Sequence, residues 1–222
     1  MKHSFSFTVL AVTLLPVWAT AQIGPQPYLQ TSDSPWAAYL NNGMFYLENM
    51  EDGALNTPGV SASVGNVIGP GGLTDSVDGD DGNIDGDGRQ GRSFFTSNGI
   101  NGITFTFSSG TYGSLPTHAG LVWTDGQTNG TTRFEAFDGN GASLGVITGS
   151  HAGSGFNGQT NEDRFYGWVH NGGIGSIKIN HTPSGGLEID HLQYGAVPEP
   201  ATMSVMGLGL AALAARRRRR SQ

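Results

Sequence analysis

Short alternating runs, separated by glycine-rich turns, constrain the fold of this 222-residue chain more than any other feature. In Ile103–Phe107 the apolar residues occupy every second position, with threonines between them, which is the period of a half-buried strand. Turn sequences such as Asp125-Gly126 and Asn171-Gly172-Gly173 interrupt the runs. Ten runs are expected as strands: Met44–Met50, Val60–Val67, Ser93–Thr96, Ile103–Phe107, Ala119–Thr124, Thr132–Phe137, Ser143–Thr148, Phe165–Val169, Ile174–Asn180 and Leu187–Tyr194.

No helical stripe of useful length precedes the C-terminal 25 residues. Many short strands at this spacing predict an all-β fold, a single antiparallel β-sandwich of jelly-roll type over residues 44–196. A β-helix is the alternative, but the sequence has no fixed repeat of the length that such a fold requires. Residues 22–43 carry three prolines and are expected to form an N-terminal arm.

The N-terminus has the organisation of a secretory signal peptide. Lys2 and His3 give a short polar start, and an apolar run from Phe5 to Val17 follows. Ala19-Thr20-Ala21 places small residues at the two positions that signal peptidases require. Residues 1–21 are therefore predicted to be a signal helix that is removed, so that the mature chain begins near Gln22.

The C-terminus carries a second processing signal, in which three features follow one another. Val197-Pro198-Glu199-Pro200 precedes a 15-residue apolar run, Ala201–Ala215, and the run is followed by Arg216, Arg217, Arg218, Arg219 and Arg220. As a helix the run would span about 22 Å, less than the roughly 30 Å of a bilayer core. We expect transient membrane insertion with the arginines on the cytoplasmic side. An ordinary transmembrane tail is the alternative.

These residues resemble the PEP-CTERM sorting domain over positions 197–220. The resemblance implies export across the inner membrane and recognition by an exosortase-type processing enzyme. It also implies removal of the tail and delivery to the cell surface or to an extracellular polysaccharide matrix.

The charge of the remaining segment, residues 22–197, restricts its partners. Of the 11 Lys and Arg residues only five lie there, against 17 of the 18 Asp and Glu residues, so its formal net charge is −12. Nucleic acid is an improbable partner, because phosphate binding needs clustered basic residues. Divalent cations are the natural counter-charge. The chain has no cysteine, which excludes thiol catalysis, thiolate zinc sites and iron–sulfur clusters.

Parts of this segment resemble exported jelly-roll domains of the carbohydrate-binding-module type. The similar stretches are Leu47–Val60, Leu121–Asp125, Phe134–Asp138 and Leu187–Gly195. The resemblance implies a structural calcium ion between the first and last strands. Carried over by position, its donors would be Glu51 and Asp190.

An acidic stretch, Asp75–Asp87, holds six aspartates in 13 residues. Within it, Asp81, Asn83 and Asp85, followed by Gly86, match the first half of an EF-hand calcium loop. The match then fails, because Arg92 stands where a bidentate glutamate is expected. We therefore expect a Ca²⁺ loop of Asp78, Asp81, Asn83 and Asp85, completed by carboxylates from elsewhere in the fold. A solvated acidic loop is the alternative.

Signatures of catalysis are absent. There is no Gly-x-Ser-x-Gly motif, and the histidines lack metal-ligand spacing such as His-x-x-x-His. The protein is therefore expected to be non-enzymatic. Tyr166 and Trp168 share one face of a predicted strand, and this pair is a candidate platform for stacking sugars, with core packing as the alternative.

Together these features predict an exported surface or matrix protein that associates with extracellular polysaccharide through a calcium-assisted β-sandwich. Two alternatives stay open: a secreted hydrolase or lyase acting on polysaccharide, and a purely structural component of the matrix.

Overall fold

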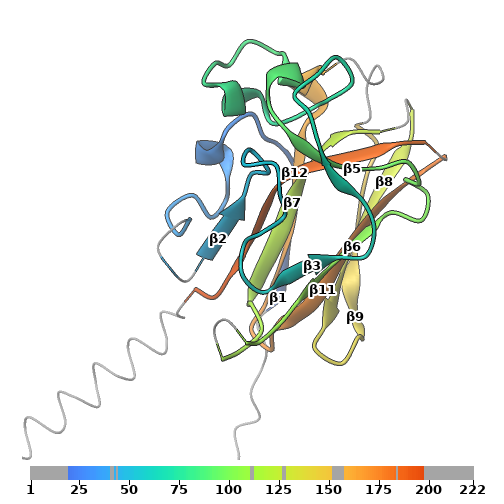
Figure 1. Ribbon diagram of the computed structural model, residues 1–222. Helices are drawn as coiled ribbons and strands as arrows, with labels where there is room; N and C mark the ends of the chain where they lie inside the picture. Colours follow the sequence, from blue (N-terminus) through green and yellow to red (C-terminus); the bar gives the residue numbers. More distant parts are fainter. Residues whose placement is uncertain are drawn as a thin grey trace, which may run out of the picture.

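The computed structural model describes residues 20–40, 43, 45–110, 113–126, 129–151, 158–183 and 185–197. Two antiparallel sheets form the body (Figure 1). In this part of the chain the helices are four 3-10 turns: η1 (Thr31–Asp33), η2 (Asp78–Asp81), η3 (Gly88–Gln90) and η4 (Thr160–Glu162). None of the described helices has the length and apolarity to cross a membrane. Residues 1–19 of the expected signal helix and the whole expected C-terminal helix lie outside the described residues, and Thr20 and Ala21 belong to a strand instead.

The larger sheet has seven strands. Its order is β1 (Thr20–Pro27), β10 (Arg164–His170), β7 (His118–Asp125), β12 (Leu187–Gly195), β5 (Ser93–Thr96) and β4 (Asn66–Ile68), with β2 (Phe45–Glu48) paired to the second half of β12. The smaller sheet runs β3 (Val60–Ala62), β6 (Ile103–Phe107), β11 (Ile174–Thr182), β8 (Thr131–Asp138) and β9 (Ser143–Gly149). The prediction of an antiparallel all-β sandwich is confirmed, and each of the ten predicted runs contains a strand.

The run Val60–Val67 was expected as one strand, but it supplies β3 to the smaller sheet and β4 to the larger one. The chain turns between the sheets at Gly65, whose φ is +105°. A Cβ atom at this position would lie 2.7 Å from the carbonyl oxygen of Phe95. Only glycine accepts both the backbone conformation and the close approach.

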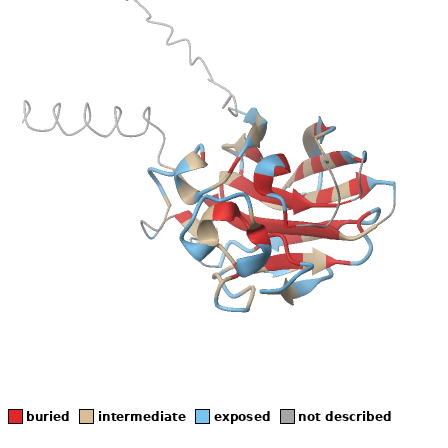
Figure 2. Cartoon of the chain, turned by 90° about the horizontal axis from the view of Figure 1, so that it is seen from above, coloured by how far each residue is buried: buried red, intermediate tan, exposed pale blue. Residues whose placement is uncertain are grey.

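The main core lies between the two sheets and follows the predicted alternation. Figure 2 shows buried residues running through the strands, with exposed residues gathered in the connecting loops. One face of each central strand points inward, because successive side chains of a strand alternate between its two sides. The buried residues of this core include Ile103, Phe105, Leu121, Trp123, Phe134, Tyr166, Trp168, Ile177, Ile179 and Ile189.

Residues 22–43 do not form a separate arm, which corrects the expectation for this segment. Gln22, where the mature chain is expected to begin, lies inside β1, which pairs with β10 at the edge of the larger sheet. An edge strand tolerates prolines, since one of its sides has no hydrogen-bonding neighbour. After β1, Tyr28 and Trp36 pack over Phe165 and form a second core on the outer face of the sheet.

Candidate cation-binding site

Acidic side chains lie on the outer face of β12, beneath the segment 74–91. Glu188 and Asp190 both face this side, whereas Ile189 between them enters the main core. The backbone N–H of Asp75 donates to Glu188 Oε2 at 3.0 Å, and that of Val77 donates to Asp190 Oδ2 at 3.0 Å. The segment therefore follows β12 with the same two-residue spacing, and both acids are buried.

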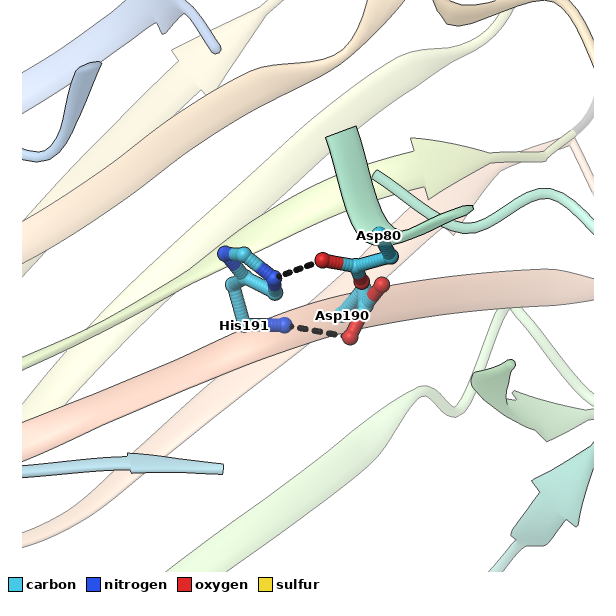
Figure 3. Close-up of side chains that lie close together, drawn as sticks. All are labelled: Asp80, Asp190 and His191. Carbon is cyan, nitrogen blue, oxygen red and sulfur yellow. Dashed lines mark hydrogen bonds and ion pairs between the residues drawn. The ribbon is translucent and has the colours of Figure 1, made fainter. Parts of the chain in front are cut away.

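Asp80, Asp190 and His191 form the tightest cluster of possible metal ligands among the described residues (Figure 3). Each offers one ligand atom, and these atoms lie within 4.8 Å of one another. Asp80 comes from η2, and the other two are consecutive residues of β12. The pairing of β12 with β7 shifts register just after Asp190, and His191 has a φ of +43°. Such a bulge brings two neighbouring side chains to the same side of a strand.

His191 is held in place by a buried chain of hydrogen bonds. The Ser34 hydroxyl donates to Gln193 Oε1 at 2.5 Å, and Gln193 Nε2 donates to the Tyr28 hydroxyl oxygen at 3.0 Å. That hydroxyl lies 2.8 Å from His191 Nδ1, and His191 Nε2 lies 2.8 Å from Asp80 Oδ1. Burial raises the pKa of Tyr28, so the phenol keeps its proton near neutral pH. Both ring nitrogens of His191 thus have partners within the protein.

Most polar atoms of this three-residue cluster are therefore already engaged within the protein. Asp190 accepts from Val77 N–H at Oδ2 and from His191 N–H at Oδ1. Among the three side chains, the buried oxygen without a partner is Oδ2 of Asp80. An imidazole ligand suits transition metals better than calcium, which takes oxygen ligands.

The predicted EF-hand-like residues do not join this cluster. Asp81 and Asp85 are exposed, and their carboxylates accept from the backbone N–H groups of Asn83 and Asp87. Asp78 is buried, but it accepts from the N–H groups of Asp85 and Gly86 at 3.0–3.1 Å. The carboxylates of Asp78, Asp81 and Asp85 therefore accept hydrogen bonds from the backbone of their own loop and do not converge on one point. Such local side chain–backbone bonds stabilise the turns of the loop.

Glu51, expected from the domain resemblance to join Asp190 as a calcium ligand, is not a member of the three-residue cluster, although the charges of Asp80 and His191 act on its pKa. Glu51 follows β2 and accepts the N–H of Arg92 at 2.6 Å. Glu48, within β2, accepts from the N–H groups of Met50, Asn56 and Thr57. The loop after β2 thus occupies the carboxylate of Glu48, whereas Glu51 has one oxygen bonded to the backbone of Arg92.

Trp168 and Tyr166 are core residues, which corrects the expectation of a sugar platform. Trp168 is 2% exposed and its Nε1 donates to Thr20 Oγ1 at 3.0 Å, while the Tyr166 hydroxyl lies 2.5 Å from His151 Nε2. Phe165 points to the opposite face of β10, away from the main core. That face is not exposed either, because the segment after β1 covers it.

Among the described residues, two carboxylates that were not predicted as ligands are buried with neither oxygen hydrogen-bonded. Asp75 and Asp163 are both 0% exposed, and all four of their carboxylate oxygens lack a hydrogen-bond partner. Burial raises the pKa of Asp75 to about 9, helped by the charge of Asp125. Burial and the charge of Asp75 raise the pKa of Asp163 as well. In the sequence, Asp75 opens the acidic stretch, and Asp163 belongs to a pair of adjacent acids with Glu162.

A pocket of about 380 Å³ opens over the end of β12 that carries Glu188. Its walls include Ile68, Leu73, Phe95 and Gly186, and its polar groups come from Asp125 and Glu188. Phe95 pairs with Glu188, and Glu188 pairs with Asp125, so the three form one row across β5, β12 and β7. Burial raises the pKa of Asp125 to about 6 and that of Glu188 to about 8.

Comparison with known families identifies the C-terminal signal. Residues 196–220 match the model of the PEP-CTERM protein-sorting motif, which confirms the prediction made for Val197–Arg220. The motif indicates an exported, exosortase-processed protein at the cell surface. Of the predicted signal, Val197 is described and packs against the outer core, and residues 198–220 lie outside the described residues. Among curated proteins no significant match exists.

Several solved structures resemble the sandwich at low sequence identity. The C-terminal family 22 carbohydrate-binding module of Clostridium thermocellum Xyn10B is 13% identical, with a TM-score of 0.39, and covers 70% of this chain and 96% of its own. A family 22 xylan-binding domain is 12% identical with a TM-score of 0.38 at the same coverage. The enzymatically active domain of bacteriophage CBA120 tailspike protein 4 is 17% identical with a TM-score of 0.33, covering 68% of this chain and 21% of its own.

Proposed function

We propose that this exported protein associates with extracellular polysaccharide at the pocket beside Phe95, in a sandwich that calcium helps to stabilise. The sorting motif supports delivery to the outside of the cell, where polysaccharide is available as a partner. The protein acts as a binding component without catalysis of its own. Before the protein takes on this role, the C-terminal tail inserts transiently into the membrane and an exosortase-type enzyme processes it.

The row formed by Phe95, Glu188 and Asp125 is the observation that carries the proposal. A partly exposed aromatic ring lies in the same cross-strand row as two carboxylates, and Leu73, 74% exposed, extends the apolar wall. A sugar ring presents an apolar face for an aromatic ring and hydroxyl groups that donate hydrogen bonds to carboxylates. Pockets that combine apolar walls with a few convergent polar groups are typical ligand sites.

Hydrolysis of a polysaccharide is a second candidate function at the same pocket. The pKa of Asp125 lies near 6 and that of Glu188 near 8, so that near neutral pH one carboxyl is ionised and the other protonated. Glycosidases use such a pair as base or nucleophile and acid. Binding is favoured because both oxygens of Glu188 already accept protein donors, from the Ser93 hydroxyl at 3.1 Å and from the N–H of Asp75 at 3.0 Å.

Retention of the full chain on a panel of insoluble polysaccharides tests the proposal, with and without a chelator. We expect retention on at least one polymer, and about tenfold weaker binding for Phe95→Ala, the loss expected from one aromatic contact. Tyr39→Ala removes another partly exposed ring and serves as the control, with unchanged retention. Failure to bind any polymer would contradict the proposal. Release of reducing sugar that Glu188→Gln abolishes would assign the pocket to hydrolysis instead.

A further inference from the structure

One carboxylate oxygen at the junction of η2 and β12 is buried and unused. Oδ2 of Asp80 has no hydrogen-bond partner among the described residues, and the Asp80 side chain is 7% exposed. The other oxygen of this carboxylate lies 2.8 Å from His191 Nε2, so the group is aimed into the space that it shares with Asp190 and His191 (Figure 3). Because buried carboxylate oxygens normally accept a hydrogen bond, an unpaired one points to a ligand from outside the chain.

The three side chains of this cluster offer ligand atoms at short range. One atom from each of Asp80, Asp190 and His191 lies within 4.8 Å of the other two. Asp190 accepts the backbone N–H of Val77 at one oxygen and that of His191 at the other. A carboxylate has about four lone-pair sites, so Asp190 can also bind an ion. A divalent ion balances the two negative charges, whose burial is otherwise unfavourable.

The hydrogen bonds around His191 allow its Nε2 to bind a metal. A nitrogen that binds a metal carries no proton, so the ring proton has to lie on Nδ1 and be donated to an acceptor. The Tyr28 hydroxyl lies 2.8 Å from Nδ1 and accepts one bond from Gln193 Nε2 at 3.0 Å. A hydroxyl oxygen has two acceptor lone pairs, which leaves one for Nδ1–H. The imidazole can therefore serve as a ligand without any movement of its neighbours.

This ligand set fits a transition metal and does not fit calcium. Calcium takes about six to eight oxygen ligands, whereas one of the three groups here is a nitrogen. Glu51, which the domain resemblance adds, already accepts the backbone N–H of Arg92 at 2.6 Å. Zinc binds imidazole nitrogen and carboxylate oxygen at about 2.0–2.2 Å, usually in a tetrahedral arrangement. Three protein ligands then leave one position for a water molecule.

We infer that Asp80, Asp190 and His191 bind a divalent transition-metal ion of the zinc type, which fastens the η2 turn to β12. Asp80 and His191 are 111 residues apart in the chain, so the ion links distant parts of the sequence. Disulfides supply such links in many exported proteins, and this chain has no cysteine. The inference is independent of the proposed polysaccharide binding and of the calcium in that proposal.

Zinc titration of the metal-stripped full chain by calorimetry tests the inference. A single zinc ion is expected to bind, about 100-fold more tightly than calcium. Asp80→Asn and His191→Gln should each weaken zinc binding at least about tenfold, because loss of an outer partner alone has an effect of that size. Asp81→Asn is the matched control from the same turn, since Asp81 is exposed, and its affinity should equal that of the wild type. Absence of zinc binding, equal affinities of Asp80→Asn and the wild type, or tighter binding of calcium would each overturn the assignment.

A thermal melt of the same variants separates loss of the ion from loss of the fold. Asparagine keeps the shape of the Asp80 side chain, so metal-stripped Asp80→Asn should melt close to the wild type. Zinc should raise the melting temperature of the wild type and of Asp81→Asn, and leave Asp80→Asn unchanged. A rise of the same size in Asp80→Asn would contradict the inference.

Cobalt provides a second readout that does not depend on stability. Co²⁺ bound to the wild-type protein should absorb visible light, and His191→Gln should change this spectrum because the nitrogen ligand is lost. An identical spectrum in the variant would exclude His191 as a ligand and contradict the inference. A chain that binds zinc but no polysaccharide would leave this inference intact and refute the proposed function alone.

Discussion

The hydrogen-bonded chain behind His191 is most sharply tested by Tyr28→Phe. The substitution removes one oxygen and keeps the ring, which stacks on Phe165 at a centroid distance of 6.0 Å. Two buried bonds disappear, one from Gln193 Nε2 at 3.0 Å and one between the Tyr28 hydroxyl and His191 Nδ1 at 2.8 Å. At about 1 kcal/mol for each bond, with a further cost for the buried nitrogen left without a partner, the free energy of unfolding should fall by about 2–3 kcal/mol.

A loss of this size is measurable by thermal melting or by urea titration. In a domain of this length each kcal/mol shifts the melting temperature by about 2–4 °C, so a fall of about 5–10 °C is expected. Tyr39→Phe is the matched control, because the Tyr39 side chain is 39% exposed, and it should shift the midpoint by less than 1 °C. If Tyr28→Phe changed stability no more than the control does, the buried chain of hydrogen bonds would not exist as described.

Three further perturbations test the packing and the titration of the sandwich. Gly145→Val should lower the free energy of unfolding by about 1–3 kcal/mol in a urea titration, since φ is +138° there and a Cβ would lie 2.6 Å from the ring of Trp168. The control Gly72→Ala should be close to neutral, because a Cβ at that position meets nothing within 4 Å. Equal effects of the two substitutions would refute the packing argument. Burial lowers the pKa of His118 to about 4, and because the unfolded chain binds that proton near pH 6.5, stability should fall as the pH drops from about 6.5 to about 4. His118→Gln should lose this contribution, so the difference in unfolding free energy between the variant and the wild type should change with pH. A difference that stays constant over this pH range would contradict the assignment. Deletion of residues 22–27 should lower the melting temperature by exposing the edge of β10, and an unchanged midpoint would show that β1 contributes nothing.

Local pattern was enough to predict most of the strands and the fold class. Alternation in Ile103–Phe107 and in β11 marks one buried face, and the turn residues between runs mark the ends of the strands. These signals succeed because pleating and turn geometry depend on residues that are neighbours in the chain. The strand Thr20–Pro27 was missed because its prolines argue against a strand unless one knows that it lies at an edge.

The candidate ion site depended on contacts that no local pattern reports. Dense aspartates marked residues 75–87 as a candidate ion-binding stretch, but they did not show which of them would be buried or left without a partner. Asp80 bonds to His191 across 111 residues of sequence, and the N–H of Asp75 bonds to Glu188 across 113. These long-range contacts depend on how the segment 74–91 packs against β12.

The sequence alone therefore determined the C-terminal sorting signal and the fold class, a cysteine-free β-sandwich whose strands alternate apolar and polar residues. Tertiary structure alone decided which face of β10 is covered, which placed Trp168 in the core, and which carboxylates are buried without partners. The physical reason is that period and turn chemistry act over a few residues, whereas desolvation depends on everything that packs around a side chain.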